Sequence, residues 1–176
     1  MAHQLVITAV GPDRKGLVGE LTGHIHRAGA NFADSRMVNL EGQFALLVLV
    51  EGDEPVIERV RHELRESAPL MGLSVTFSDQ PAQQPATKEP GIHFRLKTYS
   101  MDQPGIVHRV TKFLQEQGIN IEELETKLDS APFTGTDVFT MEILMSVPRA
   151  TAVKALRKGL EELGDTLNCD IDLDPA

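Results

Sequence analysis

Residues 13–18 read Asp-Arg-Lys-Gly-Leu-Val, and residues 102–107 read Asp-Gln-Pro-Gly-Ile-Val, 89 positions further along the chain. The same spacing aligns further residues of matching character: Leu21 with Val110, Ile25 with Leu114, Gly29 with Gly118, and Asn31 with Asn120. Because one register matches glycines, asparagines and apolar positions at once, the sequence indicates a duplicated domain.

The residues around each copy of this motif predict the same order of elements. In the first copy, residues 5–10 form a β-branched run typical of a buried strand, and apolar residues then recur at helical spacing from Leu17 to Ala28. Gly29 is expected to end that helix. The later elements are predicted as strands over 32–40 and 43–50 joined at Glu41-Gly42, a helix from Pro55, and a strand over 73–77.

The second copy repeats this order. Its elements are predicted over residues 93–98, 106–117, 121–128, 138–147, 150–163 and 167–173, with a longer hairpin loop over 129–137. Residues 79–91 are rich in Pro and Gln and are expected to be a linker. The chain is therefore predicted to be an α+β protein with two βαββαβ domains, residues 1–78 and 92–176. Each should have an antiparallel sheet with both helices on one face.

Composition narrows the classes of function. The formal net charge is −9, and no run of basic residues is longer than two, so direct binding to nucleic acid is not expected. The N-terminus has no secretory pattern, and no apolar run approaches the length of a membrane span. With Cys169 as the only cysteine, an internal disulfide is excluded. The expected location is the cytoplasm, without membrane contact.

The repeated motif suggests a binding site for a small anion. Asp13 and Asp102 precede a helix, and we interpret each as a helix N-cap. The first turn of such a helix presents backbone N–H donors, and Gly16 and Gly105 have no side chain to block approach, so a free amino acid's carboxylate would fit. Asn31 and Asn120 begin the next strand, where a carboxamide could bind the ligand or simply complete a turn.

Other chemistries have weaker support. His24 and His26 lie two apart on a predicted helix and point to different sides, which disfavours a shared metal ion. Cys169 precedes an acidic stretch that would raise the pKa of its thiol, and it is expected to be a structural residue of the last strand. The acidic residues from 170 to 174 alternate with Ile171 and Leu173, as on an edge strand. No catalytic residues, metal or cofactor are therefore predicted.

Two stretches carry a resemblance to a known family. Residues 11–18 read Gly-Pro-Asp-Arg-Lys-Gly-Leu-Val, and residues 29–36 read Gly-Ala-Asn-Phe-Ala-Asp-Ser-Arg. Together they resemble the ACT domain, which has a ferredoxin-like fold, and in particular the ACT proteins that repress the glycine cleavage system. The resemblance covers both halves and is closest over residues 5–50.

The resemblance implies a non-enzymatic sensor that binds glycine or a serine-like amino acid and represses the glycine cleavage operon through contact with a DNA-binding activator. The alternative is an ACT subunit that modulates a metabolic enzyme in trans, and a homodimer is left open. If the domains pair edge to edge, each turn would face the other domain's asparagine, with the first turn favoured by its cations. The expected ligand-binding residues are Asp13, Arg14, Gly16, Leu17, Asn31, Asp102, Gly105, Ile106 and Asn120.

Overall fold

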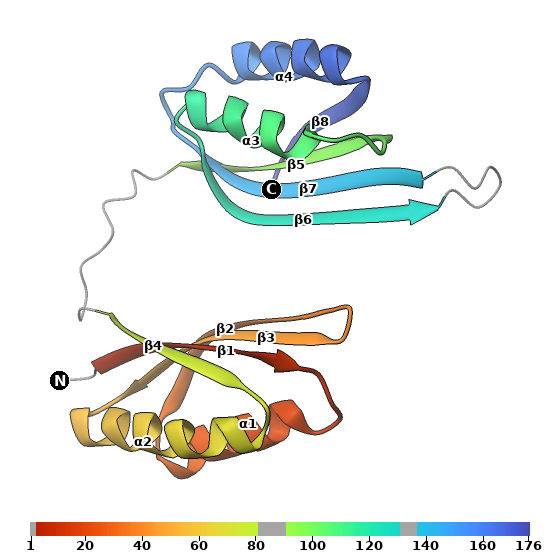
Figure 1. Ribbon diagram of the computed structural model, residues 1–176. Coiled ribbons are helices and arrows are strands. Elements are labelled where there is room, and N and C mark those ends of the chain that lie inside the picture. The colour runs from red at the N-terminus through yellow and green to blue at the C-terminus, as the bar shows by residue number, and fades with distance from the viewer. Residues whose placement is uncertain (1–2, 81–90, 131–136) are drawn as a thin grey trace. The chain divides into compact units, whose positions relative to one another are not determined.

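The computed structural model describes residues 3–80, 91–130 and 137–176, which form one compact unit in each half of the chain. The first unit contains β1 (His3–Pro12), α1 (Leu17–Arg27), β2 (Asn31–Leu40), β3 (Gln43–Gly52), α2 (Glu54–Leu70) and β4 (Ser74–Gln80). Its strands pair in the order β2-β3-β1-β4, all antiparallel. Both helices lie on one face of the sheet (Figure 1).

The second unit repeats this architecture. It contains β5 (Ile92–Met101), α3 (Ile106–Glu116), β6 (Asn120–Ser130), β7 (Asp137–Val147), α4 (Val153–Leu167) and β8 (Cys169–Pro175). The strand order is β6-β7-β5-β8, again antiparallel throughout, with α3 and α4 on one face (Figure 1). Both units are therefore α+β domains of the predicted βαββαβ type.

Alternation along the central strands explains why each sheet has one covered face. Leu5, Ile7 and Ala9 on β1 are fully buried, while the residues between them are partly exposed. Since successive side chains of a strand point to opposite faces, the buried set faces the helices and the other set faces away. Leu21 and Ile25 of α1 complete the core from the helix side, both fully buried.

The structure adjusts several predicted boundaries. β4 continues to Gln80, two residues into the segment expected to be linker, and residues 81–90 lie outside the described residues. β6 and β7 extend into the predicted hairpin loop, of which residues 131–136 also lie outside the described part. α4 begins at Val153 and ends at Leu167, several residues later than expected at both ends. These differences are typical of element ends, where periodicity carries little information.

Other local predictions are confirmed. α1 is followed by Gly29 at φ +89°, and the turn between β2 and β3 has positive φ at both Glu41 and Gly42. α2 begins next to Pro55, with the Asp53 side chain accepting a hydrogen bond from the Val56 N–H at 3.0 Å. Across the described residues, no helix has the length and apolarity needed to span a membrane.

Candidate functional site

The turn before α1 has a different geometry from the one expected for a capped helix. The N-cap residue is Gly16, in a left-handed conformation with φ +86°, and no side chain caps the helix. The interpretation of Asp13 as the N-cap is therefore wrong, because the N-cap lies three residues beyond it. A glycine is needed at position 16, since a side chain would be strained at this φ.

Asp13 instead fastens the turn to the β2–β3 hairpin. Its N–H donates to the Gly42 carbonyl at 2.8 Å, and its Oδ2 accepts a hydrogen bond from the Asn39 side chain. Asn39 in turn accepts a bond from the Gly42 N–H at 3.3 Å. Asn39 was not among the predicted site residues, and its separation from Asp13 by 26 positions gave no local signal. The role of Asp13 in the structure is to position the turn.

The first turn of α1 does present free backbone donors. The Leu17 N–H bonds to the Arg14 carbonyl at 3.3 Å, but among the described residues the N–H groups of Val18 and Gly19 have no recorded acceptor. Such unpaired donors at a helix N-terminus attract anions. The Leu17 side chain is buried in the core, so this residue can approach a ligand only through its backbone.

Arg14, in the turn before α1, forms an ion pair with a carboxylate of that helix. Its guanidinium donates to both oxygens of Glu20, at 2.7 and 2.6 Å. This bidentate bond lowers the pKa of Glu20 and raises the pKa of Arg14. Glu20 Oε1 also lies 3.8 Å from the point that a Cβ on Gly16 would occupy. Glu20 thus offsets the positive charge of Arg14 that was expected to favour a ligand carboxylate at this turn. Lys15 is the cation that remains there.

The turn before α3 has the same backbone and different charges. Gly105 is the N-cap with φ +97°, no side chain caps the helix, and no atom lies within 4 Å of its would-be Cβ. Asp102 is therefore not the N-cap either; its N–H bonds to the Asp137 carbonyl at 3.4 Å. Ile106 is buried in the core, like Leu17. Position 109, which corresponds to Glu20, is Arg109, exposed and without a recorded side-chain partner among the described residues.

The predicted asparagines lie far from the turn of their own domain. Asn31 is the first residue of β2, whereas Asn39 near the other end bonds to Asp13. At a rise of about 3.3 Å per residue, Asn31 and Asn39 are roughly 26 Å apart along β2. Asn31 and Asn120 are both exposed at the start of their strands. No single domain therefore brings its turn and its predicted asparagine together.

Asn120 does border an open cavity. This hollow, of about 440 Å³, lies between the end of α3 and the beginning of β6, and it is lined by Thr111, Gln115, Gly118, Ile119, Asn120 and Ile121. The polar side chains of this cavity are the amides of Gln115 and Asn120 and the hydroxyl of Thr111. These groups can donate and accept hydrogen bonds but carry no charge.

Among the described residues, no group of three or more His, Cys, Asp or Glu side chains could hold a metal ion. Cys169 is buried at the start of β8. The acidic residues that follow it are exposed, and Leu173 is buried, as predicted for an edge strand.

Both halves of the chain match one known family of domains. The ACT domain matches residues 3–78 and again residues 94–158. The glycine cleavage system transcriptional repressors of Escherichia coli (strain K12) and Shigella flexneri are each 24% identical over 166 residues, covering 94% of this chain and 86% of theirs.

Two solved structures are similar along the whole chain. A protein of unknown function from Galdieria sulphuraria superposes with a TM-score of 0.82 at 26% identity, covering 100% of this chain and 99% of that one. A protein proposed to be a glycine cleavage system transcriptional repressor superposes with a TM-score of 0.73 at 24% identity, covering 99% and 97%. The order of both domains is therefore shared with these proteins.

Proposed function

Because the chain belongs to the ACT-domain family and carries two such domains in tandem, we propose that it is a non-catalytic regulator that senses a small amino acid, with glycine as the first candidate. The observation that supports this most is the similarity to glycine cleavage repressors over 94% of the chain, which includes both domains. In this proposal the protein acts in the cytoplasm and represses the glycine cleavage genes by contacting a DNA-binding activator.

Contact with a protein rather than with DNA fits the charge of the chain. The net charge of −9 opposes binding to the phosphate backbone. A mobility-shift assay on glycine cleavage operator DNA tests this. The protein alone should leave the DNA unshifted, and it should alter the complex of the activator with that DNA in a glycine-dependent manner. A salt-dependent shift by the protein alone would contradict the proposal.

For the ligand, we propose that the amino-acid carboxylate binds at the strand-to-helix turns. Gly16 and Gly105 leave the backbone donors accessible, and among the described residues the N–H groups of Val18 and Gly19 have no recorded acceptor. The remaining predicted residues differ in what they can contribute. Asp13 positions the first turn through its side chain, and Asp102 the second through its N–H alone. Leu17 and Ile106 offer only backbone groups. Asn31 and Asn120 lie too far from the turn of their own domain to bind the ammonium group of a glycine held there.

Calorimetry with glycine and serine tests this site. Gly16→Val and Gly105→Val each add a branched side chain at a left-handed position, which should block the donors and weaken binding at that turn at least tenfold. Circular dichroism and thermal melting establish that each variant is folded. Gly23→Val is the matched control, since position 23 lies further along α1, away from the turn, and a Cβ there would meet only the end of the Arg27 side chain, at 3.4 Å. If both turn variants are folded and bind as the parent does, the turns are not the site.

A further inference from the structure

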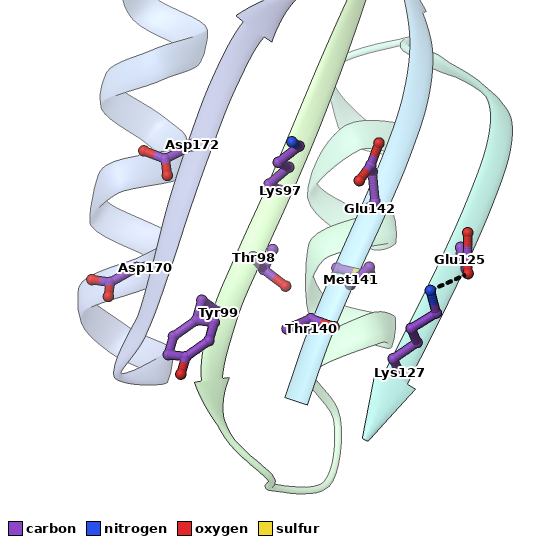
Figure 2. A pocket seen from close by; sticks show the side chains of 10 residues that line it. All are labelled: Lys97, Thr98, Tyr99, Glu125, Lys127, Thr140, Met141, Glu142, Asp170 and Asp172. Atoms are coloured by element: carbon purple, nitrogen blue, oxygen red, sulfur yellow. Dashed lines mark ion pairs between the residues drawn. The ribbon is translucent and has the colours of Figure 1, made fainter. Parts of the chain in front are cut away.

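The sheet of the second domain has a cavity on the face that its helices leave open. It has a volume of about 370 Å³ and is lined by residues of all four strands (Figure 2). Lys97 and Tyr99 of β5 reach it because they alternate with residues that are buried against the helices. A cavity of this size is within the range that holds a small molecule.

The strand register brings opposite charges face to face in this cavity. Lys97 lies directly across from Asp172 on one side and Glu142 on the other, and Tyr99 lies across from Asp170 and Thr140. Lys97 and Asp172 would be expected to close into a cross-strand ion pair. Within the described part of the chain, no ion pair or hydrogen bond is recorded for either side chain, nor for Asp170.

The other charges of the cavity are already engaged. Arg95 forms an ion pair with Glu142, and this bond, together with Lys97 and Lys127, lowers the pKa of that carboxyl. Lys127 contacts Glu125 at 3.0 Å, which raises the pKa of its ammonium (Figure 2). Lys97 therefore remains as the available cation, and Asp170 and Asp172 remain as the available anions.

Tyr99 adds an aromatic surface beside the two free carboxylates. It is 56% exposed, and its ring lies near Asp170 in Figure 2. An aromatic face next to carboxylates attracts a cation, and a planar guanidinium can both stack on the ring and bind a carboxylate with two hydrogen bonds. Carboxylates also outnumber ammonium groups in the lining, so a ligand with an additional positive charge is favoured.

We propose that this cavity binds a basic amino acid, with its α-carboxylate on Lys97 and its side-chain cation held by Asp170, Asp172 and the Tyr99 ring. Lys97 and Asp170 are diagonal neighbours on paired strands, and such positions lie about 7–8 Å apart. That separation suits a ligand whose carboxylate and cation are at opposite ends of a short aliphatic chain. The site is additional to the turns proposed for the small amino acid.

The first domain supplies a natural comparison. Its sheet has the same strand order, but uncharged residues replace Lys97, Tyr99, Glu142, Asp170 and Asp172 at the corresponding positions: Thr8, Val10, Leu47, Ser74 and Thr76. The position of Glu125 carries a cation there, Arg36. The open face of that sheet thus lacks the counterparts of the cation and the two carboxylates that are proposed to hold the ligand. We expect the basic amino acid to bind once per chain, in the second domain only.

Tyr99 provides a direct readout, because the chain has one tyrosine and no tryptophan. L-Arginine added to the full chain should change the tyrosine emission in a saturable way, and calorimetry should give a stoichiometry of one. Citrulline, whose side chain carries no positive charge, should not bind. Agmatine, which lacks the carboxylate, should bind more weakly, and Lys97→Gln should reduce the affinity for arginine to that for agmatine.

The decisive variant is Asp170→Asn/Asp172→Asn, which should weaken arginine binding at least tenfold. Glu161→Gln/Glu162→Gln removes the same charge from the exposed surface of α4 and should leave binding unchanged. The proposal is overturned if arginine gives no saturable signal, if the Asp variant binds as the parent does, or if both double variants lose affinity equally. Glycine binding, measured on the same proteins, should be unaffected by either pair, so this proposal and that for the turns can fail separately.

Discussion

The two strand-to-helix turns have the same backbone and opposite charges. Each places a glycine at positive φ before the helix, at Gly16 and Gly105. One helical turn later the first domain has Glu20, which binds Arg14, whereas the second has an exposed Arg109. The duplication has kept the conformation that requires glycine, and the electrostatics of the two turns have diverged. The fold of one turn therefore does not predict which ligand the other prefers.

The two cores differ in how tightly they pack at one end of the sheet. Gly11 pairs with Phe44 in the first sheet, and Ser100 pairs with Phe139 at the corresponding place in the second. A Cβ on Gly11 would lie 2.4 Å from the Gly72 carbonyl oxygen, so no larger residue fits there without movement. Phe44 is fully buried beside this glycine, while Phe139 is only partly buried. The first domain is the more tightly packed at this end of the sheet.

The largest expected effect comes from removing these two rings. Phe44→Ala should lower the free energy of unfolding of the first domain by about 3–5 kcal/mol, because it leaves a cavity in a closed core. Phe139→Ala should cost the second domain clearly less, since its ring is already partly in solvent. Hydrogen exchange resolved by peptide reports each domain separately. Equal losses in the two domains would show that the difference in packing has no energetic consequence.

A second, smaller effect concerns buried hydroxyls. Thr98 and Ser100 are buried on β5, and neither hydroxyl has a hydrogen-bond partner among the described residues; the corresponding residues of the first domain are Ala9 and Gly11. Thr98→Val removes an unpaired hydroxyl at nearly constant shape and should stabilise the second domain by about 1 kcal/mol. Urea unfolding followed by tyrosine fluorescence measures this.

The exposed Thr126 on β6 offers the control for this substitution. Thr126→Val should change the stability of the second domain by no more than a few tenths of a kcal/mol. If Thr98→Val destabilises the domain, the Thr98 hydroxyl forms a hydrogen bond in solution. The difference from Ala9 would then be an added hydrogen bond and not an unpaired hydroxyl.

The architecture was predictable from sequence because it depends on periodic patterns. The 89-residue register, the alternation on β1 and the glycines after each helix are all local or repeated signals. The pairing of Asp13 with Asn39 was not predictable, because it joins the turn before α1 to the end of β2. The cavity beside Tyr99 likewise depends on the register of β5 with β8, which places Lys97 opposite Asp172. Side-chain partners far apart in sequence are determined only by the folded sheet.

Neutralising the charged side chain one helical turn after each glycine should have opposite effects on ligand affinity at the two turns. Glu20→Gln frees Arg14 and removes a carboxylate near Gly16, so glycine binding at the first turn should strengthen a few-fold. Arg109→Gln should weaken binding at the second turn by a similar factor. Calorimetry at low and high salt measures both, and each effect should shrink as salt rises. Effects of the same sign in both variants would show that these side chains do not act on a ligand carboxylate.

The smallest expected effect is a pH dependence of the contact between the first domain's two helices. His24 of α1 lies 2.7 Å from Glu63 of α2, and this bond lowers the pKa of Glu63. The corresponding residue of α3 is Phe113, whose ring lies 2.7 Å from the position a Cβ on Gly159 of α4 would take. One helix pair is therefore joined by a titratable contact, and the other by close apolar packing.

The sign of this pH effect follows from the lowered pKa. A carboxyl whose pKa is lower in the folded state stabilises the fold above its unfolded pKa of about 4.3, and that contribution is lost as the pH falls through the folded value. Protection of α1 and α2 in hydrogen exchange should therefore decrease on acidification below about pH 4.3, and Glu63→Gln should remove part of this dependence. Protection of α3 and α4 should not respond to Glu63→Gln, because their packing at Phe113 and Gly159 contains no titratable group. If the variant leaves the pH dependence of α1 and α2 unchanged, the contact between His24 and Glu63 does not stabilise this helix pair.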